Sequence, residues 1–264
     1  MKRGLRKKLE HQEKAYETEQ LMKEKRSEEY EALEEVFDKP TLMTIYDLMN
    51  EGWIGEIYGA VKAGKESKLY WGKHPDGTEL AIKIYLTVTA EFKKGMLTYI
   101  TGDPRFEHIK RKPRNIIYTW ARKEYRNLTE AYQANVRVPK PYTVKNNVLL
   151  MEFIGKNGIS APLLREIELS NPEKIYKQIL LYIKRLYAKA KLVHGDLSEY
   201  NIMIWKSKPV IFDVSQAVPL KHPNATQFLW RDIENINRYF KRLDVNIQST
   251  EEVYRRITGA AALR

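Results

Sequence analysis

The sequence contains no cysteine and no long hydrophobic run. Without cysteine the chain can form neither disulfides nor thiolate metal sites, and it cannot use a cysteine nucleophile. A stretch of about 18 apolar residues is absent, so the pattern predicts no membrane-spanning helix. The basic N-terminus has no apolar segment behind it and lacks the pattern of a secretory signal. We therefore expect a soluble, cytoplasmic protein without a membrane partner.

Histidine is also scarce, with five scattered residues, so a zinc site is not expected. Positive charge is abundant: 46 Lys and Arg face 34 Asp and Glu, for a formal net charge of +12. This balance favours polyanionic partners such as nucleotide phosphates or RNA, although a solvated basic surface would give the same count. With 43% hydrophobic residues in a chain of 264, a real core can form.

The first half of the chain predicts a charged extension followed by a small sheet. Residues 3–36 are dense in Glu, Lys and Arg and are typical of an exposed helix, so 1–40 is interpreted as a charged helical N-terminal extension. A short helix is expected at 41–50, and short β-type runs follow at 53–58, 60–63, 68–73 and 80–85. Residues 86–113 lack sustained periodicity and are interpreted as a long flexible insertion with some helix.

The second half predicts mainly helices. The apolar run at 148–151 favours a buried strand, after which we place a boundary between residues 41–151 and residues 152–264. Helices are expected at 114–135, 172–191, 226–243 and 250–262, with strands near 202–205 and 210–213. The whole pattern indicates an α+β fold with two lobes.

A polar loop between two apolar segments carries the strongest chemical signal. In residues 194–201, HGDLSEYN, Asp196 precedes Asn201 by five positions. Phosphoryl transfer needs an aspartate that orients the attacking hydroxyl and accepts its proton, and an amide oxygen five residues later can hold a metal ion on the phosphates. The spacing predicts Asp196 as the catalytic residue and Asn201 as a metal ligand.

A second carboxylate follows the apolar residues 210–212. Asp213 is placed where a strand ends, and Mg²⁺ prefers oxygen ligands that it shares with phosphate oxygens. Alone, Asp213 would be an ordinary loop residue. Together with Asp196 and Asn201 it predicts a catalytic and metal-binding site.

These motifs resemble those of the RIO atypical protein kinases, most closely the first subfamily in its archaeal form. The matching segments are HGDLSEYN at 194–201, DVSQ at 213–216, GKES at 64–67 and AIK at 81–83. The resemblance covers about residues 45–255. It implies a bilobal protein-kinase-like fold with a small N-lobe on an antiparallel sheet, a mainly helical C-lobe, and ATP with Mg²⁺ or Mn²⁺ between them.

The resemblance also assigns residues around the nucleotide. It implies that Lys83 binds the α- and β-phosphates, and a lysine in this role needs a fixed carboxylate partner. We expect Glu124, on a predicted helix, to supply it; Glu91 is nearer in sequence but falls in the segment interpreted as flexible. Lys65 and Ser67 belong to the expected phosphate loop, for which a plain hairpin turn is the alternative.

The strand at 148–151 leads into the expected hinge between the lobes. There the backbone of Glu152 and Ile154 would hydrogen-bond adenine, and Met151 would border the pocket. A buried strand without a ligand is the alternative. No Gly-rich triplet and no Ala-Pro-Glu segment follows Asp213, so the usual peptide-docking platform of protein kinases is missing.

Three functions compete at this point. The resemblance implies a serine kinase or ATPase that acts in maturation of the small ribosomal subunit, with the subunit precursor, its RNA or its proteins as partners and with autophosphorylation as a further expectation. A small-molecule phosphotransferase of the aminoglycoside or choline kinase type uses a similar loop. A non-catalytic RNA-binding protein would explain the charge, but not the presence of Lys83, Asp196, Asn201 and Asp213 together.

Overall fold

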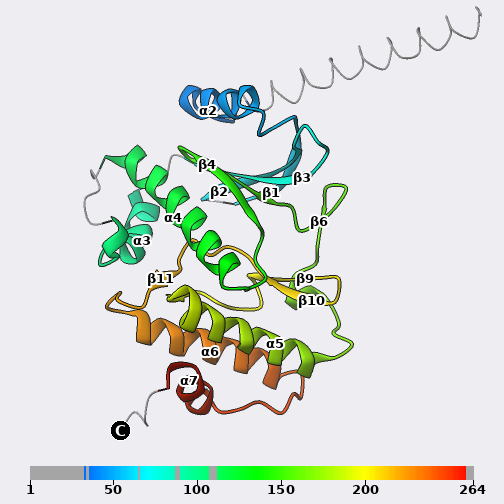
Figure 1. Ribbon diagram of the computed structural model, residues 1–264, viewed down its shortest axis with the longest axis vertical. Coiled ribbons are helices and arrows are strands. Elements are labelled where there is room, and N and C mark those ends of the chain that lie inside the picture. Colours follow the sequence, from blue (N-terminus) through cyan, green and yellow to red (C-terminus); the bar gives the residue numbers. More distant parts are fainter. Residues whose placement is uncertain (1–32, 34–35, 65, 87–89, 107–111, 260–264) are drawn as a thin grey trace, which may run out of the picture.

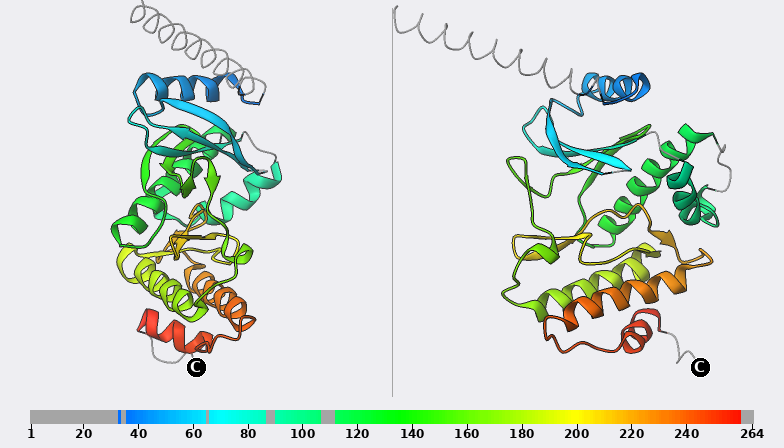
Figure 2. Two further views of the ribbon diagram at one scale, coloured as in Figure 1. Left: turned by 90° about the vertical axis from the view of Figure 1, so that its right-hand side faces the viewer. Right: turned by 180° about the vertical axis from the view of Figure 1, so that it is seen from behind.

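A computed structural model describes residues 33, 36–64, 66–86, 90–106 and 112–259, so the extension expected at 1–40 lies almost entirely outside the described residues. A lobe built on a sheet lies above a lobe of helices (Figure 1). The views in Figure 2 show the same stacking, with α5 (Pro172–Arg185) and α6 (Ala225–Lys241) below the sheet and α7 (Thr250–Thr258) farthest from it. The expected bilobal α+β architecture is confirmed.

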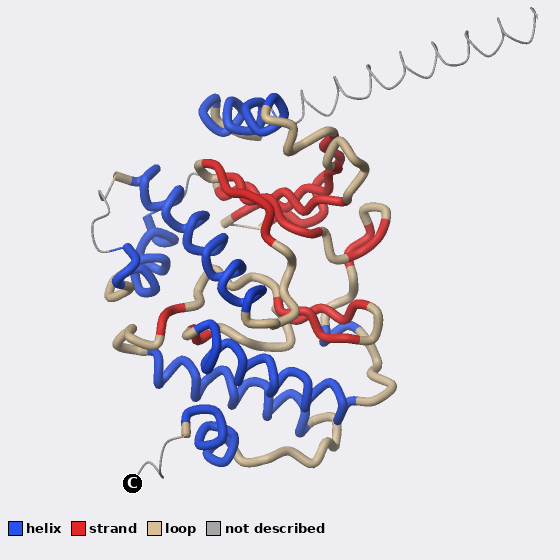
Figure 3. The backbone as a smooth tube through the Cα atoms, viewed as in Figure 1, coloured by secondary structure: helices blue, strands red, loops and turns tan. Residues whose placement is uncertain are grey.

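The N-lobe sheet is antiparallel, with strand order β1-β2-β3-β5-β4 (red in Figure 3). Its strands are β1 (Glu56–Ala63), β2 (Ser67–Lys73), β3 (Glu79–Tyr85), β4 (Pro141–Lys145) and β5 (Val148–Glu152). Strand β1 is continuous where the sequence indicated two runs, because irregularities in its register near Ala60 absorb the break in alternation. Strand β3 is the central strand, so Lys83 sits on the most enclosed part of the sheet.

Helix α2 (Lys39–Asn50) covers the upper part of the sheet. It starts two residues earlier than expected because Asp38 is its N-cap and accepts a hydrogen bond from the Thr41 backbone N–H at 3.1 Å. Pro40 occupies the first turn, where its missing N–H costs nothing. Ile45 and Leu48 are buried in one cluster with strands β2, β3 and β5.

The segment at 86–113 contains a packed helix, α3 (Ala90–Ile100), and a short 3-10 turn, η1 (Pro104–Phe106). Met96 and Ile100 are buried against Ile117 and Trp120 of α4 (Pro113–Gln133). Part of this segment therefore belongs to the N-lobe core. Its expected flexibility stays a prediction, and residues 87–89 and 107–111 lie outside the described residues.

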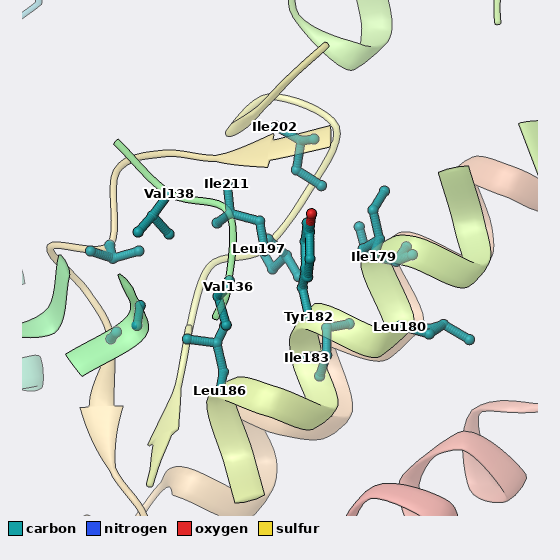
Figure 4. Packing of buried hydrophobic residues seen from close by; sticks show 14 of the residues in the cluster. Val136, Val138, Ile179, Leu180, Tyr182, Ile183, Leu186, Leu197, Ile202 and Ile211 are labelled. Carbon is teal, nitrogen blue, oxygen red and sulfur yellow. The ribbon is translucent and has the colours of Figure 1, made fainter. Parts of the chain in front are cut away.

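The C-lobe core forms under the loop at 194–201. The remaining short elements are β6 (Gly155–Lys156), β7 (Ile159–Ser160), η2 (Leu164–Glu166), η3 (Leu186–Ala190), β8 (Leu192–Val193), β9 (Ile202–Trp205), β10 (Lys208–Ile211) and β11 (Val218–Pro219). Figure 4 shows Leu197, Ile202 and Ile211 facing Ile179 and Ile183 of α5. The loop is thus anchored on both sides by buried aliphatic side chains.

The helical stretch expected at 172–191 is observed, and the helix expected at 250–262 ends early. After Arg185, α5 continues as a π-helical turn to Ala190, and Lys191 then has a left-handed backbone with φ 58°. Helix α7 stops at Gly259, whose φ of 69° closes the last turn; the rest of the expected helix at 250–262 lies outside the described residues. Among the described helices, none has the length and apolar character needed to cross a membrane.

Candidate active site

A buried ion-pair network joins the two lobes. Lys83 on β3 places its Nζ 2.9 Å from Glu124 Oε1 and 2.8 Å from Glu124 Oε2, and 3.2 Å from Asp213 Oδ1. Lys83 is 9% exposed and Glu124 is fully buried on α4. The structure therefore brings Lys83 together with the carboxylate expected as its partner, and it adds Asp213 from the C-lobe.

The charges of this network depend on one another. Burial raises the pKa of Glu124 to about 7, against the opposing effect of the Lys83 ammonium. Burial would also raise the pKa of Asp213, but Lys83 and the Ser215 hydroxyl, 2.8 Å away, hold it at about 2. Burial alone would lower the pKa of Lys83, yet the two carboxylates raise it above its ordinary value. Lys83 and Asp213 are thus both charged at neutral pH.

Asp213 stands just beyond β10 with its backbone in the left-handed region, at φ 58°. This conformation is uncommon for a residue other than glycine, and tertiary contacts must maintain it. In this conformation 46% of the Asp213 side chain is exposed, and its Oδ1 accepts hydrogen bonds from the Lys83 ammonium and the Ser215 hydroxyl. The carboxylate is therefore accessible to a ligand.

Two neighbours of Glu124 on α4 hold the loop that follows Asp213. The buried Lys123 donates through Nζ to the Ser215 carbonyl at 2.8 Å and to the Ala217 carbonyl. Asn127 donates through Nδ2 to the Val214 carbonyl at 2.8 Å. Sequence reasoning missed both roles, because a lysine and an asparagine beside a glutamate on a charged helix look like surface residues.

The loop at 194–201 is held from below by Asp232 of α6. Asp232 is 1% exposed, and its oxygens accept hydrogen bonds from the backbone N–H of Gly195 at 2.9 Å and of Leu197 at 2.8 Å. Gly195 has φ 81°, and a Cβ there would lie 3.1 Å from the Gln216 carbonyl oxygen. Asp232 was not predicted; an acidic residue among the apolar positions of an amphipathic helix was the available signal.

Asp196 and Asn201 lie within one hydrogen-bonded loop. The Asn201 side chain donates through Nδ2 to the Asp196 carbonyl at 2.8 Å, and its Oδ1 accepts from the Ser198 backbone N–H and hydroxyl, both at 2.9 Å. Burial raises the pKa of Asp196, Arg231 opposes the rise and Asp213 adds to it. An Asp196 carboxylate near another negative charge is a better proton acceptor than an isolated aspartate.

His194 braces this loop. It is buried, and its Nδ1 accepts a hydrogen bond from the Asp196 backbone N–H at 3.3 Å. Burial lowers the pKa of His194 to about 4, so the ring is neutral at physiological pH. Neutral imidazole suits a supporting role and leaves proton acceptance to Asp196.

The donor atoms near Asp213 suit a magnesium nucleotide. In the part of the chain that the structure describes, no cluster of three His, Cys, Asp or Glu residues forms a closed metal cage. Mg²⁺ in phosphoryl-transfer sites is instead bound by one or two protein oxygens together with phosphate oxygens and waters. The accessible Asp213 carboxylate and the Asn201 amide oxygen fit this pattern, provided that Asn201 Oδ1 releases Ser198.

The expected phosphate loop connects β1 and β2. Gly64 donates its N–H to the Ser67 carbonyl at 3.0 Å, and Lys62 lies with its Nζ 6.0 Å from the Phe212 ring centre, so the hairpin reaches over the residue before Asp213. Lys65 lies outside the described residues. Burial raises the pKa of Glu66, and the negative charges of Asp213 and Asp196 add to the rise. Glu66, which was not among the expected site residues, therefore faces the same space as Asp196 and Asp213.

The residues expected to form the hinge lie between β5 and β6, and their backbone groups differ in availability. Met151 pairs with Ala81 of β3. The Glu152 N–H donates to the Lys140 carbonyl at 2.8 Å, and the Ile154 carbonyl accepts from Ala161 at 2.9 Å. Both of these groups are used within the protein, which leaves the Glu152 carbonyl and the Ile154 N–H as candidates for an adenine.

The fold has a sheet lobe above a helical lobe, and a buried lysine–glutamate pair of the sheet lobe contacts Asp213 of the helical lobe beside a hydrogen-bonded aspartate loop. This arrangement defines the protein-kinase-like class. Residues 68–253 match the family model described as RIO domain. The chain belongs to the RIO family and is a RIO-type serine/threonine kinase.

The relatives span archaea and eukaryotes. The chain is 40% identical to the RIO-type serine/threonine-protein kinase Rio1 of Methanocaldococcus jannaschii, covering 94% of this chain and 84% of that protein. It is 38% identical to the Rio1 kinase of Haloferax volcanii, over 90% and 81% of the two chains. It is 38% identical to human serine/threonine-protein kinase RIO1, over 86% of this chain and 40% of that protein.

Solved structures agree on the fold. The Rio2 kinase from Chaetomium thermophilum superposes with a TM-score of 0.64 at 22% identity, covering 84% of this chain and 68% of that one. A second structure of that kinase, an ADP/Mg²⁺-phosphoaspartate complex, gives a TM-score of 0.63 at 20% identity, over 84% and 67% of the two chains.

Proposed function

We propose that this chain transfers the γ-phosphate of ATP with Asp196 as the catalytic residue and with Asn201 and Asp213 as ligands of Mg²⁺ or Mn²⁺. The observation that carries the proposal is the contact of Lys83 with both Glu124 and Asp213, because it sets a cation and an accessible anion beside the loop that bears Asp196. The metal, when bound, would neutralise phosphate charge as transfer proceeds.

The protein's own groups have separate tasks in this proposal. Lys83 holds the α- and β-phosphates and is itself held by Glu124, so it is ordered before the nucleotide arrives. Ser67 and Lys65 offer polar groups from the loop above the phosphates. The Glu152 carbonyl and the Ile154 N–H hydrogen-bond adenine beside Met151.

Asp196 then orients an incoming serine hydroxyl and takes its proton as the oxygen bonds to the γ-phosphorus and ADP leaves. Its pKa, raised by burial and by Asp213, supports this use. The rigid support from Asp232 keeps the carboxylate in place with little reorganisation.

An ATPase output is a second reading of the same site. The related Rio2 kinase was solved as a phosphoaspartate complex, and Asp213 here is an accessible, ionised carboxylate. Its oxygen would attack the γ-phosphorus, ADP would leave, and water would later cleave the acyl phosphate. Hydroxylamine-labile labelling by γ-labelled ATP that disappears in Asp213→Asn separates this output from serine phosphorylation.

The proposed cellular setting is maturation of the small ribosomal subunit in the cytoplasm. It is supported by the family resemblance and by the net charge of +12, which suits a partner rich in RNA. Replacement of Lys110, Arg111 and Lys112 by Ala should weaken binding to the subunit and flatten its salt dependence. Unchanged subunit affinity together with lost ATP binding would instead assign this basic run to the nucleotide.

The decisive experiment measures ATP turnover and phosphoryl transfer with and without small ribosomal subunits. Asp196→Ala should abolish both activities while ATP still binds, because this carboxylate orients the acceptor and need not hold the nucleotide. Turnover equal to that of the wild type in this variant would exclude Asp196 as the catalytic residue. A small-molecule phosphotransferase would show turnover with alcohols or aminoglycosides instead, and a purely RNA-binding protein would show none.

A further inference from the structure

A groove opens on the C-lobe beside the loop at 194–201, called the catalytic loop below. It has a volume of about 780 Å³ and lies between the segment from η2 to the start of α5, the end of the catalytic loop, and the end of α6. Glu199 and Tyr200 line it, and they stand between Asp196 and Asn201 in sequence. A chain bound here would thus reach the residues of phosphoryl transfer within a few residues.

The groove exposes apolar side chains that a soluble protein usually covers. Ile167 is 38% exposed, Leu243 is 40% exposed and Tyr200 is 57% exposed, and all three line the groove. A cluster of exposed apolar side chains rimmed by polar ones marks a surface for binding another chain.

The same groove is acidic although the protein is basic. Its charged walls carry four carboxylates and two guanidinium groups, from Glu166, Glu168, Glu199, Asp244, Arg165 and Arg242. In the whole sequence the formal net charge is +12, so a local excess of carboxylates runs against the composition. The groove therefore selects against RNA and for a positively charged partner.

Both arginines are already engaged within the groove. Arg242 Nη2 lies 2.8 Å from Glu199 Oε1, and the Arg165 guanidinium lies 4.7 Å from the centre of the Tyr200 ring. Within the described residues, Glu168 and Asp244 form no ion pair, so their charges face the groove without a neutralising partner. These two positions are the ones that a basic ligand would pair with.

We propose that this groove docks a basic, partly aliphatic polypeptide segment of the phosphoacceptor protein, next to the serine that is phosphorylated. The inference rests on the proposed kinase function and adds a substrate class to it. Glu168 and Asp244 pair with Lys or Arg of that segment, and an aliphatic side chain packs between Ile167 and Leu243. The docking supplies what the missing peptide platform after Asp213 would otherwise provide.

The test uses two synthetic serine peptides of one length. One carries three arginines and a leucine near the serine, and the other has glutamine in place of each arginine. The double variant Glu168→Lys, Asp244→Lys is compared with the full-length wild type and with Glu234→Lys, which changes an exposed acidic residue of α6 outside the groove. Anisotropy measures binding, steady-state assays measure kcat and KM for each peptide, and ATP turnover is measured without peptide.

For the basic peptide, the double variant should bind about tenfold more weakly and show a correspondingly higher KM, since exposed ion pairs are worth a few-fold each and reversal adds repulsion. The neutral peptide, ATP turnover without peptide and the Glu234→Lys control should not change. Equal binding of both peptides by the wild type would overturn the groove assignment, as would displacement of the basic peptide by a single-stranded RNA of the same length. Absence of ATP turnover in every protein would count against the proposed function, while the binding arm would still decide the groove.

Discussion

Replacement of Lys123 by Met tests how α4 holds the loop after Asp213. The ammonium group of Lys123 is fully enclosed and bonds the carbonyls of Ser215 and Ala217. Methionine has a similar length and no donor, so the Ser215 carbonyl loses its bond. The Ala217 carbonyl keeps one hydrogen bond, from Asn127 Nδ2 at 3.0 Å.

The expected magnitude combines two opposing effects. A buried carbonyl without a partner costs about 1–3 kcal/mol of stability. Burial of the charged ammonium is itself unfavourable, because desolvation lowers the pKa of Lys123 to about 7 from its ordinary value of 10.5. The unfolded chain then binds more protons than the folded chain between about pH 7 and pH 10, so the wild type gains stability as pH rises, by about 2 kcal/mol up to pH 9. The methionine variant lacks this gain.

Urea unfolding of both proteins from neutral to alkaline pH provides the measurement, with Arg122→Met as a control on an exposed neighbour. The destabilisation caused by Lys123→Met should grow with pH, and the kcat of the variant should fall more than its affinity for ATP. A difference in stability that stays flat with pH, with kcat unchanged, would refute the placement of Lys123 as a loop anchor.

Three further predictions concern the same machinery. Asp213→Asn should weaken Mg²⁺-dependent ATP binding about tenfold or more while metal-free binding changes little, and equal losses in calorimetry would count against a metal ligand. Asp232→Asn should cost about 1–3 kcal/mol because an amide oxygen replaces two acceptors. Since burial raises the Asp232 pKa to about 7, the folded chain binds an extra proton between about pH 4 and pH 7, and the wild type should lose more stability than the variant as the pH rises through this range. Limited proteolysis should cut residues 86–113 first, although the buried Met96 predicts slow cleavage within α3; early cuts elsewhere would contradict the expected flexibility.

The sequence was informative where chemistry depends on spacing along the chain. Asp196 and Asn201 share one loop, and Asp213 follows a strand, so residue type and position were enough to propose them. Glu124 could be chosen because a rigid helix was predicted around it, and the structure places it against Lys83.

The supporting residues could not be found in the same way. Asp232 and Lys123 act on segments that are 37 and 92 residues away in sequence, through contacts that only the fold creates. In the sequence, Asp232 and Lys123 are each a charged residue on an amphipathic helix, and the sequence does not indicate that their side chains are buried. The packed helix α3 was also underestimated, because its apolar face is short and irregular and its burial depends on α4.

Helix α4 carries Lys123 and Glu124 side by side, and consecutive helical residues point about 100° apart. Lys123 hydrogen-bonds the C-lobe loop after Asp213, and Glu124 pairs with Lys83 of the sheet. A rotation of α4 about its own axis would therefore pull both attachments out of place in the same movement. Helix α3 packs against α4, so a partner that binds α3 and shifts it would also rotate α4. The Lys83–Glu124 pair and the Lys123 hydrogen bonds to the loop after Asp213 would then be lost together and not one at a time.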